Sequence, residues 1–279
     1  MSFVICHFAT RYLIFPMRLF LEFSKRSFQR HLTYRAATVA GLATNLFFGL
    51  LRAAVLIALY GSRESLAGLS VDGAVTYTGI TQAGAAYLSL FGWWHLMMSV
   101  ESGEVGSDML KPMNYYVFWM AQDFGRAAVQ VLLRGLPIML VYALIFDITY
   151  PTHLGQWIVF AITIVLSWLI SFSFNFLVNL AAFWTPNARG IGRFAFGFAW
   201  TLSGFFLPLR FFPDWFVTMA NFTPFPSTVN TVVEIYLELL TGTALLEALL
   251  IQVFWGVVLI VAGQLVLRAG IRRLVIQGG

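Results

Sequence analysis

The sequence has few charged residues and a single cysteine, and each shortage excludes a class of protein. Of the 279 residues, 10% are charged, 59% are hydrophobic and 17% are aromatic. A soluble domain has about 25% charged and about 45–50% apolar residues. So few charges cannot cover a water-facing surface, which indicates that most of this surface faces lipid. The lone Cys6 excludes an internal disulfide framework and a zinc site built from cysteines.

Sequence motifs of nucleotide-binding and hydrolytic sites are also absent. There is no GxxxxGK[ST] phosphate-binding loop, no HExxH zinc motif and no GxSxG nucleophile turn, and the four histidines are scattered. Any ATP must therefore be bound by another chain, and we expect this one to hold no cofactor or metal. The net charge of +5 does not indicate nucleic acid, because the basic residues flank hydrophobic segments rather than forming a soluble basic module.

The hydrophobic residues form about six runs that are long enough to cross a membrane. A spanning helix needs roughly 20 mainly apolar residues. The runs are continuous, whereas the strands of a membrane barrel alternate apolar and polar residues over about 10 positions. We therefore predict an all-α polytopic membrane protein that forms one transmembrane domain over residues 1–279. The predicted spans are residues 38–60, 77–100, 127–146, 157–184, 194–209 and 245–267.

Lysine and arginine lie mostly on one side of these predicted spans. Cytoplasmic loops of membrane proteins are enriched in basic residues. With a cytoplasmic N-terminus, the outer loops carry only Arg63 and Arg210. Both termini and the loop after the second span are therefore predicted to be cytoplasmic. The basic residues on that side are Arg11, Arg18, Lys25, Arg26, Arg30, Arg35, Lys111, Arg126, Arg189, Arg193, Arg268, Arg272 and Arg273.

Residues 18–35 have the pattern of an amphipathic helix. Arg18, Glu22, Lys25 and Arg26 recur at helical spacing, opposite a face of leucine and phenylalanine. Such a helix lies in the plane of the membrane interface, with its basic side toward lipid headgroups. Two roles fit this pattern equally well. The helix either anchors the chain at the membrane or couples it to a partner.

Polar residues inside the predicted spans are the next candidates for function. Arg134 lies within about two turns of an interface, as does Arg52, so snorkelling of the side chain to water competes with a functional role. Asn175 and Asn179 lie one turn apart on one face of the fourth span. They either bond neighbouring helices or line a substrate path. Glu247, near one end of the last span, is the only acidic residue in the predicted spans, which gives an intramembrane enzyme little support.

The most polar segment, residues 101–124, follows the second predicted span and begins "ESGEVGSDMLKP". Gly103 lets the chain turn out of the span, and Asp108 is placed to cap a short helix. Pro112 ends one helix or begins another. Glu104 and Lys111 add charge close to the membrane. The segment is either an ordinary solvated loop or a rigid docking element for a cytoplasmic partner.

Residues 210–242 form an outer segment that is too interrupted to span the membrane again. Proline breaks it into short pieces, while Trp215, Phe222 and Phe225 keep it hydrophobic. Irregular backbone at membrane depth persists only when it is buried in protein or lines a cavity. We therefore predict a re-entrant hairpin with these three aromatic side chains buried against the bundle. Glu234 and Glu238, spaced one helical turn apart, form either a solvated face or an exit vestibule.

Together these features resemble the permease subunits of ATP-binding-cassette exporters of the second type. The resemblance covers nearly the whole chain. It rests on "ESGEVGSDMLKPMNYY" after the second span, and on "SGFFLPLRFFPDW" followed by "TPFPSTV" before the last span. More narrowly, the chain resembles the bacterial branch whose operons pair two different permeases with one ATPase. In such exporters the polar loop after the second span forms a coupling helix that docks into a separate ATPase, which favours the docking interpretation of residues 101–124.

The resemblance implies a complete transport system. Two permeases, identical or homologous, would lie in the bacterial inner membrane and sit on two ATPase subunits. The ATPase subunits would bind ATP and Mg. The substrate would be amphipathic, such as a lipid, a lipid-linked glycan or a hydrophobic drug. Two other functions fit a protein of this composition: a channel or secondary transporter that needs no ATPase, and a membrane-embedded enzyme that modifies lipids. The first usually has buried acids or inverted repeats, and the second needs a convergent catalytic cluster.

Overall fold

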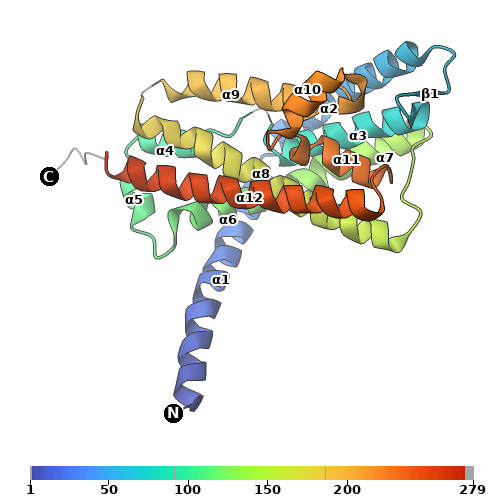
Figure 1. The fold of residues 1–279 in the computed structure, drawn as a ribbon. Helices are drawn as coiled ribbons and strands as arrows, with labels where there is room; N and C mark the ends of the chain where they lie inside the picture. Colours follow the sequence, from blue (N-terminus) through green and yellow to red (C-terminus); the bar gives the residue numbers. More distant parts are fainter. Residues whose placement is uncertain (1, 91, 186, 274–279) are drawn as a thin grey trace.

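The computed structural model describes residues 2–90, 92–185 and 187–273, which are almost entirely helical (Figure 1). The all-α prediction is therefore confirmed. The main helices are α1 (Ser2–Thr33), α2 (Arg35–Tyr60), α3 (Val71–Tyr87), α4 (His95–Glu101), α5 (Val105–Met109), α6 (Tyr115–Gln130), α7 (Leu136–Ile145), α8 (Leu154–Asn179), α9 (Ala188–Leu202), α10 (Asp214–Asn221), α11 (Asn230–Tyr236) and α12 (Gly242–Ile271). A π-helical turn η1 (Val131–Gly135) joins α6 to α7, and 3-10 turns are η2 (Leu180–Phe183), η3 (Leu209–Phe211) and η4 (Pro226–Thr228). The strands β1 (Ser65–Leu66) and β2 (Leu69–Ser70) pair antiparallel.

Four helical segments of the described chain are long and apolar enough to cross a membrane. They are Ala36–Tyr60, Tyr115–Ile145, Leu154–Phe183 and Gly242–Ile271. These match the first, third, fourth and sixth predicted spans. The third begins at Tyr115 rather than at residue 127, because α6, η1 and α7 continue one another. The first turns of α6 therefore belong to this membrane-spanning helix and not to the polar loop that was predicted to reach residue 124.

The second and fifth predicted spans are not continuous helices. Residues 77–100 divide into α3, which ends at Tyr87, and α4, which begins at His95. In the break between them, Ser89 and Gly92 have φ angles of 52° and 99°, which are incompatible with an α-helix. The fifth predicted span is represented by α9, which has 15 residues and ends at Leu202. Hydropathy measures how apolar a segment is. It does not detect a break in a helix, because the residues of the break are also apolar and their carbonyl groups are bonded by side chains of other helices.

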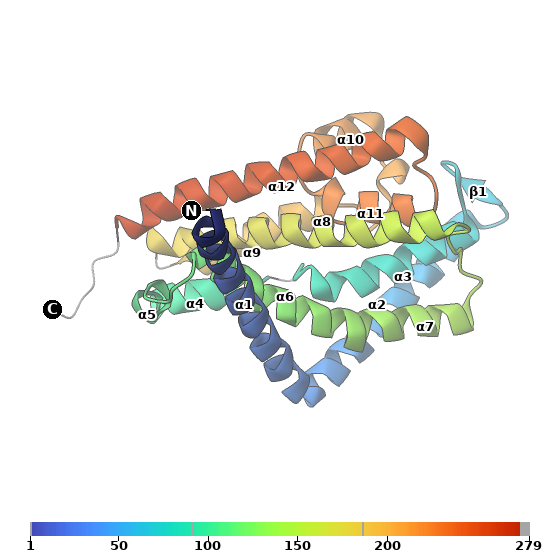
Figure 2. The ribbon, with the colours of Figure 1, turned by 90° about the horizontal axis from the view of Figure 1, so that it is seen from below.

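The long helices run roughly side by side, and α1 lies across them (Figures 1 and 2). One end of the bundle carries α4, α5 and the C-terminal end of α12, and we call it the α5 end. The opposite end carries β1, β2 and the start of α12, and we call it the β1 end. Helix α1 packs on α6 through Gly125, where an added Cβ would lie 2.1 Å from the backbone oxygen of Ser24. The hydroxyl of Ser27 donates to the carbonyl oxygen of Gln122 at 2.6 Å.

An aromatic core joins the α3–α4 break to α6 and α8. The Trp93 and Trp119 rings meet edge to face at 5.2 Å between centroids, and Tyr116 meets Phe172 in the same way at 5.2 Å. Tyr116 also shares a hydrogen bond with Ser173 at 2.7 Å. Edge-to-face aromatic pairs stabilise a core by about 0.5–1.5 kcal/mol beyond area burial. This aromatic core therefore lies toward the α5 end.

Residues 203–241, which include most of the segment predicted to be a re-entrant hairpin (210–242), are built from helical pieces that are each too short to span a membrane. The hairpin itself stays a prediction. Arg210 reaches the β1 end, where its side chain donates to the carbonyl oxygen of Ala67 at 3.1 Å. The chain then returns into the bundle, where Phe225 packs on Phe174 with 5.0 Å between ring centroids. It runs back out to Tyr236, which packs on Trp157 at the start of α8.

The predicted burial of aromatic side chains in this segment is correct for one residue and wrong for two. Phe225 is partly buried against α8, as expected. Trp215 is 69% exposed and Phe222 is 79% exposed. Helix α10 instead turns Ala220 and Phe216 toward the bundle. In lipid an outward aromatic ring carries no hydrophobic penalty, so hydrophobicity alone does not decide which side of a membrane helix is buried.

Candidate functional site

Helix α5 presents one exposed face at the end of the bundle. Gly103, with a φ of 79°, reverses the chain after α4, as predicted for a turn out of the span. Glu104, Ser107 and Leu110 recur at three-residue spacing and are all exposed, Leu110 to 87%. Val105, by contrast, is 1% exposed and packs into the aromatic core. The segment is thus a small helical element anchored from beneath.

Asp108 anchors α5 rather than capping it, so the predicted capping role is wrong. The first residue flanking α5 is Glu104, and no side chain caps the helix there. The Asp108 carboxylate accepts from Ser99 on α4 at 2.7 Å and from Lys111 at 2.6 Å. The Lys111 ammonium also lies 3.7 Å from the centroid of the Phe118 ring on α6. Asp108 faces inward because it bonds three segments of this end of the chain together.

The turn between α5 and α6 ends at a conventional helix cap. Pro112 lies in the turn, where a missing backbone N–H costs nothing. The Asn114 side chain accepts from the backbone N–H groups of Tyr116 and Val117 at 3.0 and 3.3 Å. Pro112 lies between α5, which ends at Met109, and α6, which begins at Tyr115, so it neither ends nor begins a helix itself.

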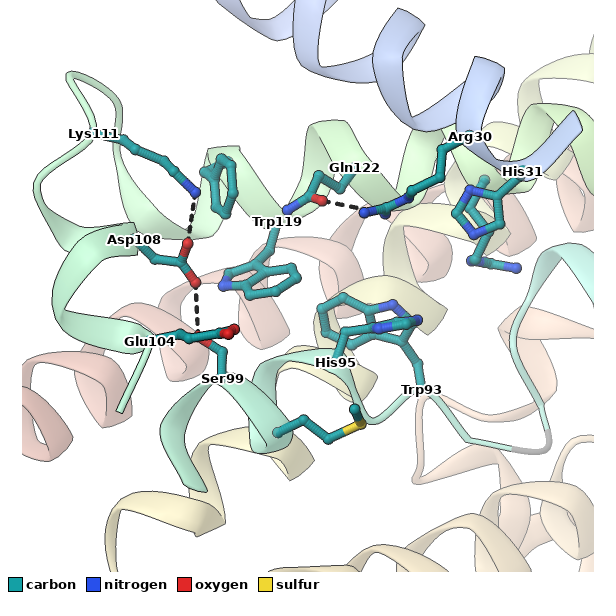
Figure 3. Close-up of a pocket in the computed structure, with 13 residues that line it drawn as sticks. Arg30, His31, Trp93, His95, Ser99, Glu104, Asp108, Lys111, Trp119 and Gln122 are labelled. Carbon is teal, nitrogen blue, oxygen red and sulfur yellow. Dashed lines mark hydrogen bonds and ion pairs between the residues drawn. The ribbon is translucent and has the colours of Figure 1, made fainter. Parts of the chain in front are cut away.

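A cavity of about 270 Å³ lies between this element, α1 and α6 (Figure 3). Figure 3 shows that Arg30 and His31 enter from α1, while His95 and Glu104 come from the α4–α5 side. The walls between them are aromatic and polar. The cavity is lined by Arg30, His31, Trp93, His95, Met98, Ser99, Glu104, Asp108, Lys111, Phe118, Trp119, Gln122 and Arg126.

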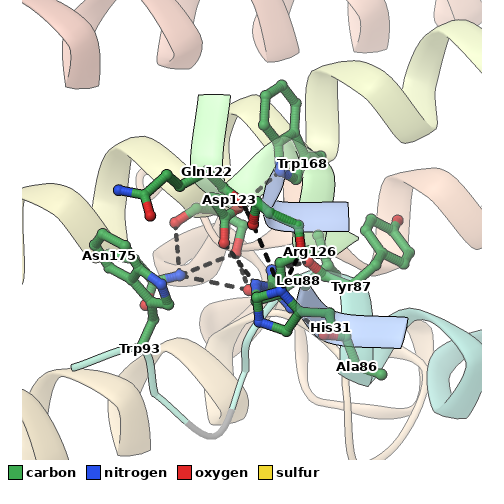
Figure 4. Close-up of polar contacts among 12 residues, drawn as sticks. His31, Ala86, Tyr87, Leu88, Trp93, Gln122, Asp123, Arg126, Trp168 and Asn175 are labelled. Carbon is green, nitrogen blue, oxygen red and sulfur yellow. Dashed lines mark hydrogen bonds and ion pairs between the residues drawn. The ribbon is translucent and has the colours of Figure 1, made fainter. Parts of the chain in front are cut away.

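The carbonyl groups left free by the α3–α4 break are bonded by side chains from other helices. Arg126 of α6 donates to the carbonyl oxygens of Ala86 and Tyr87 at 2.9 and 2.7 Å (Figure 4). Further carbonyls in the break also accept from side chains: Leu88 from Ser171 and Asn175, Leu90 from Trp200, and Trp93 from Asn179. A buried carbonyl without a partner costs about 1–3 kcal/mol, so these donors stabilise the break inside the bundle.

A buried ion pair, which our sequence analysis missed, lies beside this break. Asp123 is 4% exposed and Arg126 is 8% exposed. The Arg126 Nε donates to Asp123 Oδ1 at 2.7 Å, and the indole nitrogen of Trp168 donates to Asp123 Oδ2 at 2.8 Å. The expectation that Glu247 is the only acid in the spans is therefore wrong, because α6 enters the bundle at Tyr115. The spacing of Asp123 and Arg126, three residues apart in a helix, was the sequence feature that could have predicted this ion pair.

Asn175 and Asn179 bond α8 to the α3–α4 break, which is the helix-bonding role considered above. Asn179 is fully buried, and its side chain donates to the Trp93 carbonyl at 2.6 Å and accepts from the Met97 N–H at 3.0 Å. Asn175 donates to the carbonyl oxygen of Leu88 at 3.4 Å. Asn175 Oδ1 is buried and has no hydrogen-bond partner among the described residues, and a role of the two asparagines in a substrate path stays a prediction.

The two span arginines bond backbone in neighbouring segments. Arg134 donates to the Ala37 carbonyl oxygen at 2.9 Å, at the start of α2. Arg52 donates to the Phe205 carbonyl oxygen at 2.7 Å, and its guanidinium lies 4.1 Å from the centroid of the Phe205 ring. The snorkelling interpretation of Arg52 is therefore wrong. It anchors the segment that follows α9.

The two outer glutamates do not share a helix face, because α11 ends at Tyr236. Glu234 accepts from Arg210 at 3.0 Å. Glu238 has a φ of 56° and accepts from the Thr152 N–H at 2.9 Å. Each glutamate closes a contact between loops at the β1 end, so a continuous acidic pair is absent there.

The polar face predicted for residues 18–35 is present on α1. Its residues Arg18, Glu22, Lys25 and Arg26 are all exposed, while Ser24 and Ser27 are buried against α6. In the described part of the chain, no group of three His, Cys, Asp or Glu side chains is placed to hold a metal ion.

Comparison with known proteins identifies the family. The family model described as "ABC-2 family transporter protein" matches residues 46–278, which is most of the chain. No curated protein and no solved structure matches it. The matched region includes the α4–α5 element, the break and the segment 203–241. The chain belongs to the ABC-2 family of transporter proteins, as a transmembrane permease subunit of an ABC transporter.

Proposed function

We propose that this permease belongs to an ATP-driven exporter and that a separate ATPase subunit docks on the exposed face of α5. The observation that supports the docking site most directly is the geometry of α5. Glu104, Ser107 and Leu110 face outward at the end of the bundle, while Val105 and Asp108 hold the helix to the protein. A partner that pushes on this face meets a braced element and not a loose loop.

Force on α5 has a direct route into the bundle. The Asp108–Ser99 hydrogen bond joins α5 to α4, and Lys111 joins it to Phe118 on α6. Helix α4 follows the break, Arg126 holds the end of α3 to α6, and Asn179 holds the first turn of α4 to α8. Movement of α4 against α3 therefore requires these bonds to lengthen or exchange, which makes the break the natural hinge between the ATPase and the spans.

The remaining parts of the system are proposed from the family and the charge pattern. The α5 end and both termini would be cytoplasmic, in the inner membrane of a bacterium. ATP and Mg would be bound by the ATPase, and a second permease, identical or homologous, would complete the path. The aromatic-rich spans suit an amphipathic or lipid-like substrate. Permeases of this family normally work with an ATP-binding subunit, which favours this system over an ATPase-independent channel or a lipid-modifying enzyme.

A leucine pair at opposite ends of the molecule provides the test. Leu110 and Leu154 are 87% and 78% exposed, and each is changed to asparagine. The Leu110 variant should fold normally, because surface changes alter stability by about 0.5 kcal/mol or less. It should nevertheless lose the ATPase during purification, or lose substrate-stimulated ATP hydrolysis. The Leu154 variant, at the β1 end, should keep both.

Glu104→Lys should weaken the same association by reversing a charge on the docking face. Asp108 is not suitable for this experiment, because its substitution would also release α5 from Ser99 and Lys111. Equal ATPase association in the Leu110 and Leu154 variants would show that the ATPase does not dock on the exposed face of α5. Transport by the purified chain with no ATPase present would instead support the channel or secondary transporter.

A further inference from the structure

The cavity between α1 and α4 has a cationic end whose charges are not neutralised within the protein. Arg30 makes only a long 3.4 Å bond to the Gln122 side chain, and it forms no ion pair in the described chain. Nδ1 of His31 donates to the Ser27 carbonyl oxygen at 2.8 Å, which leaves Nε2 free. His95 faces the same space from α4 (Figure 3).

The other charged groups of this cavity are already paired or lie at its far end. Lys111 is bonded to Asp108, and Arg126 is bonded to Asp123 and to the end of α3. Glu104 lines the α5 side and forms no ion pair within the described residues. The excess positive charge is therefore concentrated beside α1.

Burial lowers the pKa of His31 most, and the nearby guanidiniums of Arg30 and Arg126 lower it further. The Ser27 hydrogen bond and the Asp123 carboxylate act in the opposite direction but do not reverse the shift. An anion in the cavity would remove the electrostatic cost of a protonated imidazole and raise this pKa.

A second cavity of about 310 Å³ continues from the first toward the spans. The two share Trp93, His95, Met98 and Arg126, and the second extends along α6 to Gln130 and Arg134. Beside them lies α1, which crosses the bundle (Figure 1) and exposes apolar residues such as Met17 and Leu21 and basic residues such as Arg18 and Arg26. A ligand that enters here can place a polar group by α1 and an apolar part along the helices.

We propose that the phosphate group of a membrane phospholipid binds in this cavity between α1 and α4, held by Arg30, His31 and His95. Arginine and imidazolium N–H groups form short charge-assisted bonds to phosphate oxygens. The cavity of about 270 Å³ accommodates a headgroup, and the adjoining cavity receives the glycerol and the start of the chains. This lipid site is separate from the docking face of α5 and does not depend on the ATPase.

The experiment uses the purified full chain in detergent and dioctanoyl phosphatidic acid as the probe. Dioctanoylglycerol has the same tails without phosphate, and inorganic phosphate has no tails. The variant is Arg30→Gln with His95→Gln. The matched control is Arg26→Gln, an exposed arginine one turn earlier on α1. Thermal shift titrations give the dissociation constant of each probe.

Phosphatidic acid should raise the unfolding temperature of the unmodified chain and of the control, and dioctanoylglycerol should not. The double variant should bind phosphatidic acid at least about tenfold more weakly, which corresponds to losing one charge-assisted bond. Equal binding by the double variant, or an equal effect of dioctanoylglycerol, would overturn the proposal. If inorganic phosphate at the same concentration raised the unfolding temperature equally, the proposal of a lipid would be refuted, and the site would be assigned to a soluble phosphate.

A second measurement on the unmodified chain remains informative if the double variant fails to fold. The probe in this measurement is dioctanoyl phosphatidylglycerol, whose phosphodiester keeps a single charge between pH 6 and 8. Because bound phosphate raises the pKa of the imidazoles, binding takes up protons, and affinity for this probe should increase as pH falls from 8 to 6. An affinity that does not change with pH over this range would remove both histidines from the site and refute the proposal.

Discussion

Replacing Arg126 with methionine should destabilise the protein strongly, because one side chain serves three partners. Its guanidinium bonds Asp123 at 2.7 Å, the Ala86 carbonyl at 2.9 Å and the Tyr87 carbonyl at 2.7 Å. Methionine has a similar length and no donors, so it fills the space and leaves a buried carboxylate and two buried carbonyls without this partner. Breaking a buried ion pair from one side costs about 3–5 kcal/mol.

Detergent-solubilised protein is heated and the folded fraction is measured by fluorescence-detected size exclusion. Each kcal/mol shifts the midpoint of a protein of this size by about 2–4 °C, so we expect a fall on the order of 10 °C. Asp123→Asn removes the carboxylate but keeps an acceptor for Trp168. The double variant should cost less than the sum of the two single changes, by about 1–3 kcal/mol, because each single change leaves the other charge unpaired.

The control is Arg189→Met, which removes an ion pair of similar length in an exposed setting. Arg189 lies 2.8 Å from Glu101, with side chains 52% and 30% exposed. Exposed pairs contribute about 0–1 kcal/mol. The reasoning is refuted if the Arg126 and Arg189 variants lose similar stability, or if the Asp123 and Arg126 effects simply add.

Three further predictions follow from single contacts. Gly125→Ala should weaken the packing of α1 on α6 by about 1–3 kcal/mol, because the added Cβ would lie 2.1 Å from a backbone oxygen. Gly197→Ala is the control, since its added Cβ meets open space. Protease cleavage of α1 should increase only in the Gly125 variant, and equal cleavage in both variants would contradict the prediction. A cysteine at Ser107 should label only from the cytoplasm and one at Ser65 only from outside; external labelling at Ser107 contradicts the proposed orientation. Burial lowers the pKa of His31 below its ordinary value of about 6.5, so near that pH the unfolded chain binds more protons than the folded chain. Stability should therefore fall as pH drops from 7.5 to 5.5. In thermal scans, His31→Gln should reduce this dependence of stability on pH.

Much of the fold could be predicted from local properties of the sequence. The four long helices are continuous apolar runs, and each matches a predicted span. Gly103 and Pro112 marked the turn region around α5, because their backbone restrictions act within one or two residues. The exposed polar face of α1 follows directly from the spacing of Arg18 and its neighbours. These features depend on residues close together in the chain.

Predictions of individual site contacts were less successful where the partners are distant. Asp108 was expected to cap a helix, but Ser99 and Lys111 bind it instead. Arg52 was expected to reach water, but it binds the carbonyl of Phe205, 153 positions away. A polar side chain can form its hydrogen bonds with neighbours in sequence or with distant residues, and the sequence alone does not show which of these it does.

The sequence by itself determined that the protein is helical and inserted in a membrane, and where a polar turn region interrupts the apolar segments. Composition and hydropathy determine these features because they show whether each segment faces lipid or water. Only the tertiary structure decided that residues 88–90 and 92–94 leave the helix. Their carbonyls are bonded by Ser171, Asn179 and Trp200, which lie 83–110 positions along the chain. It also decided that Asp123 and Arg126 are buried. An apolar segment continues as a helix unless its backbone groups find other partners, and those partners come from packing.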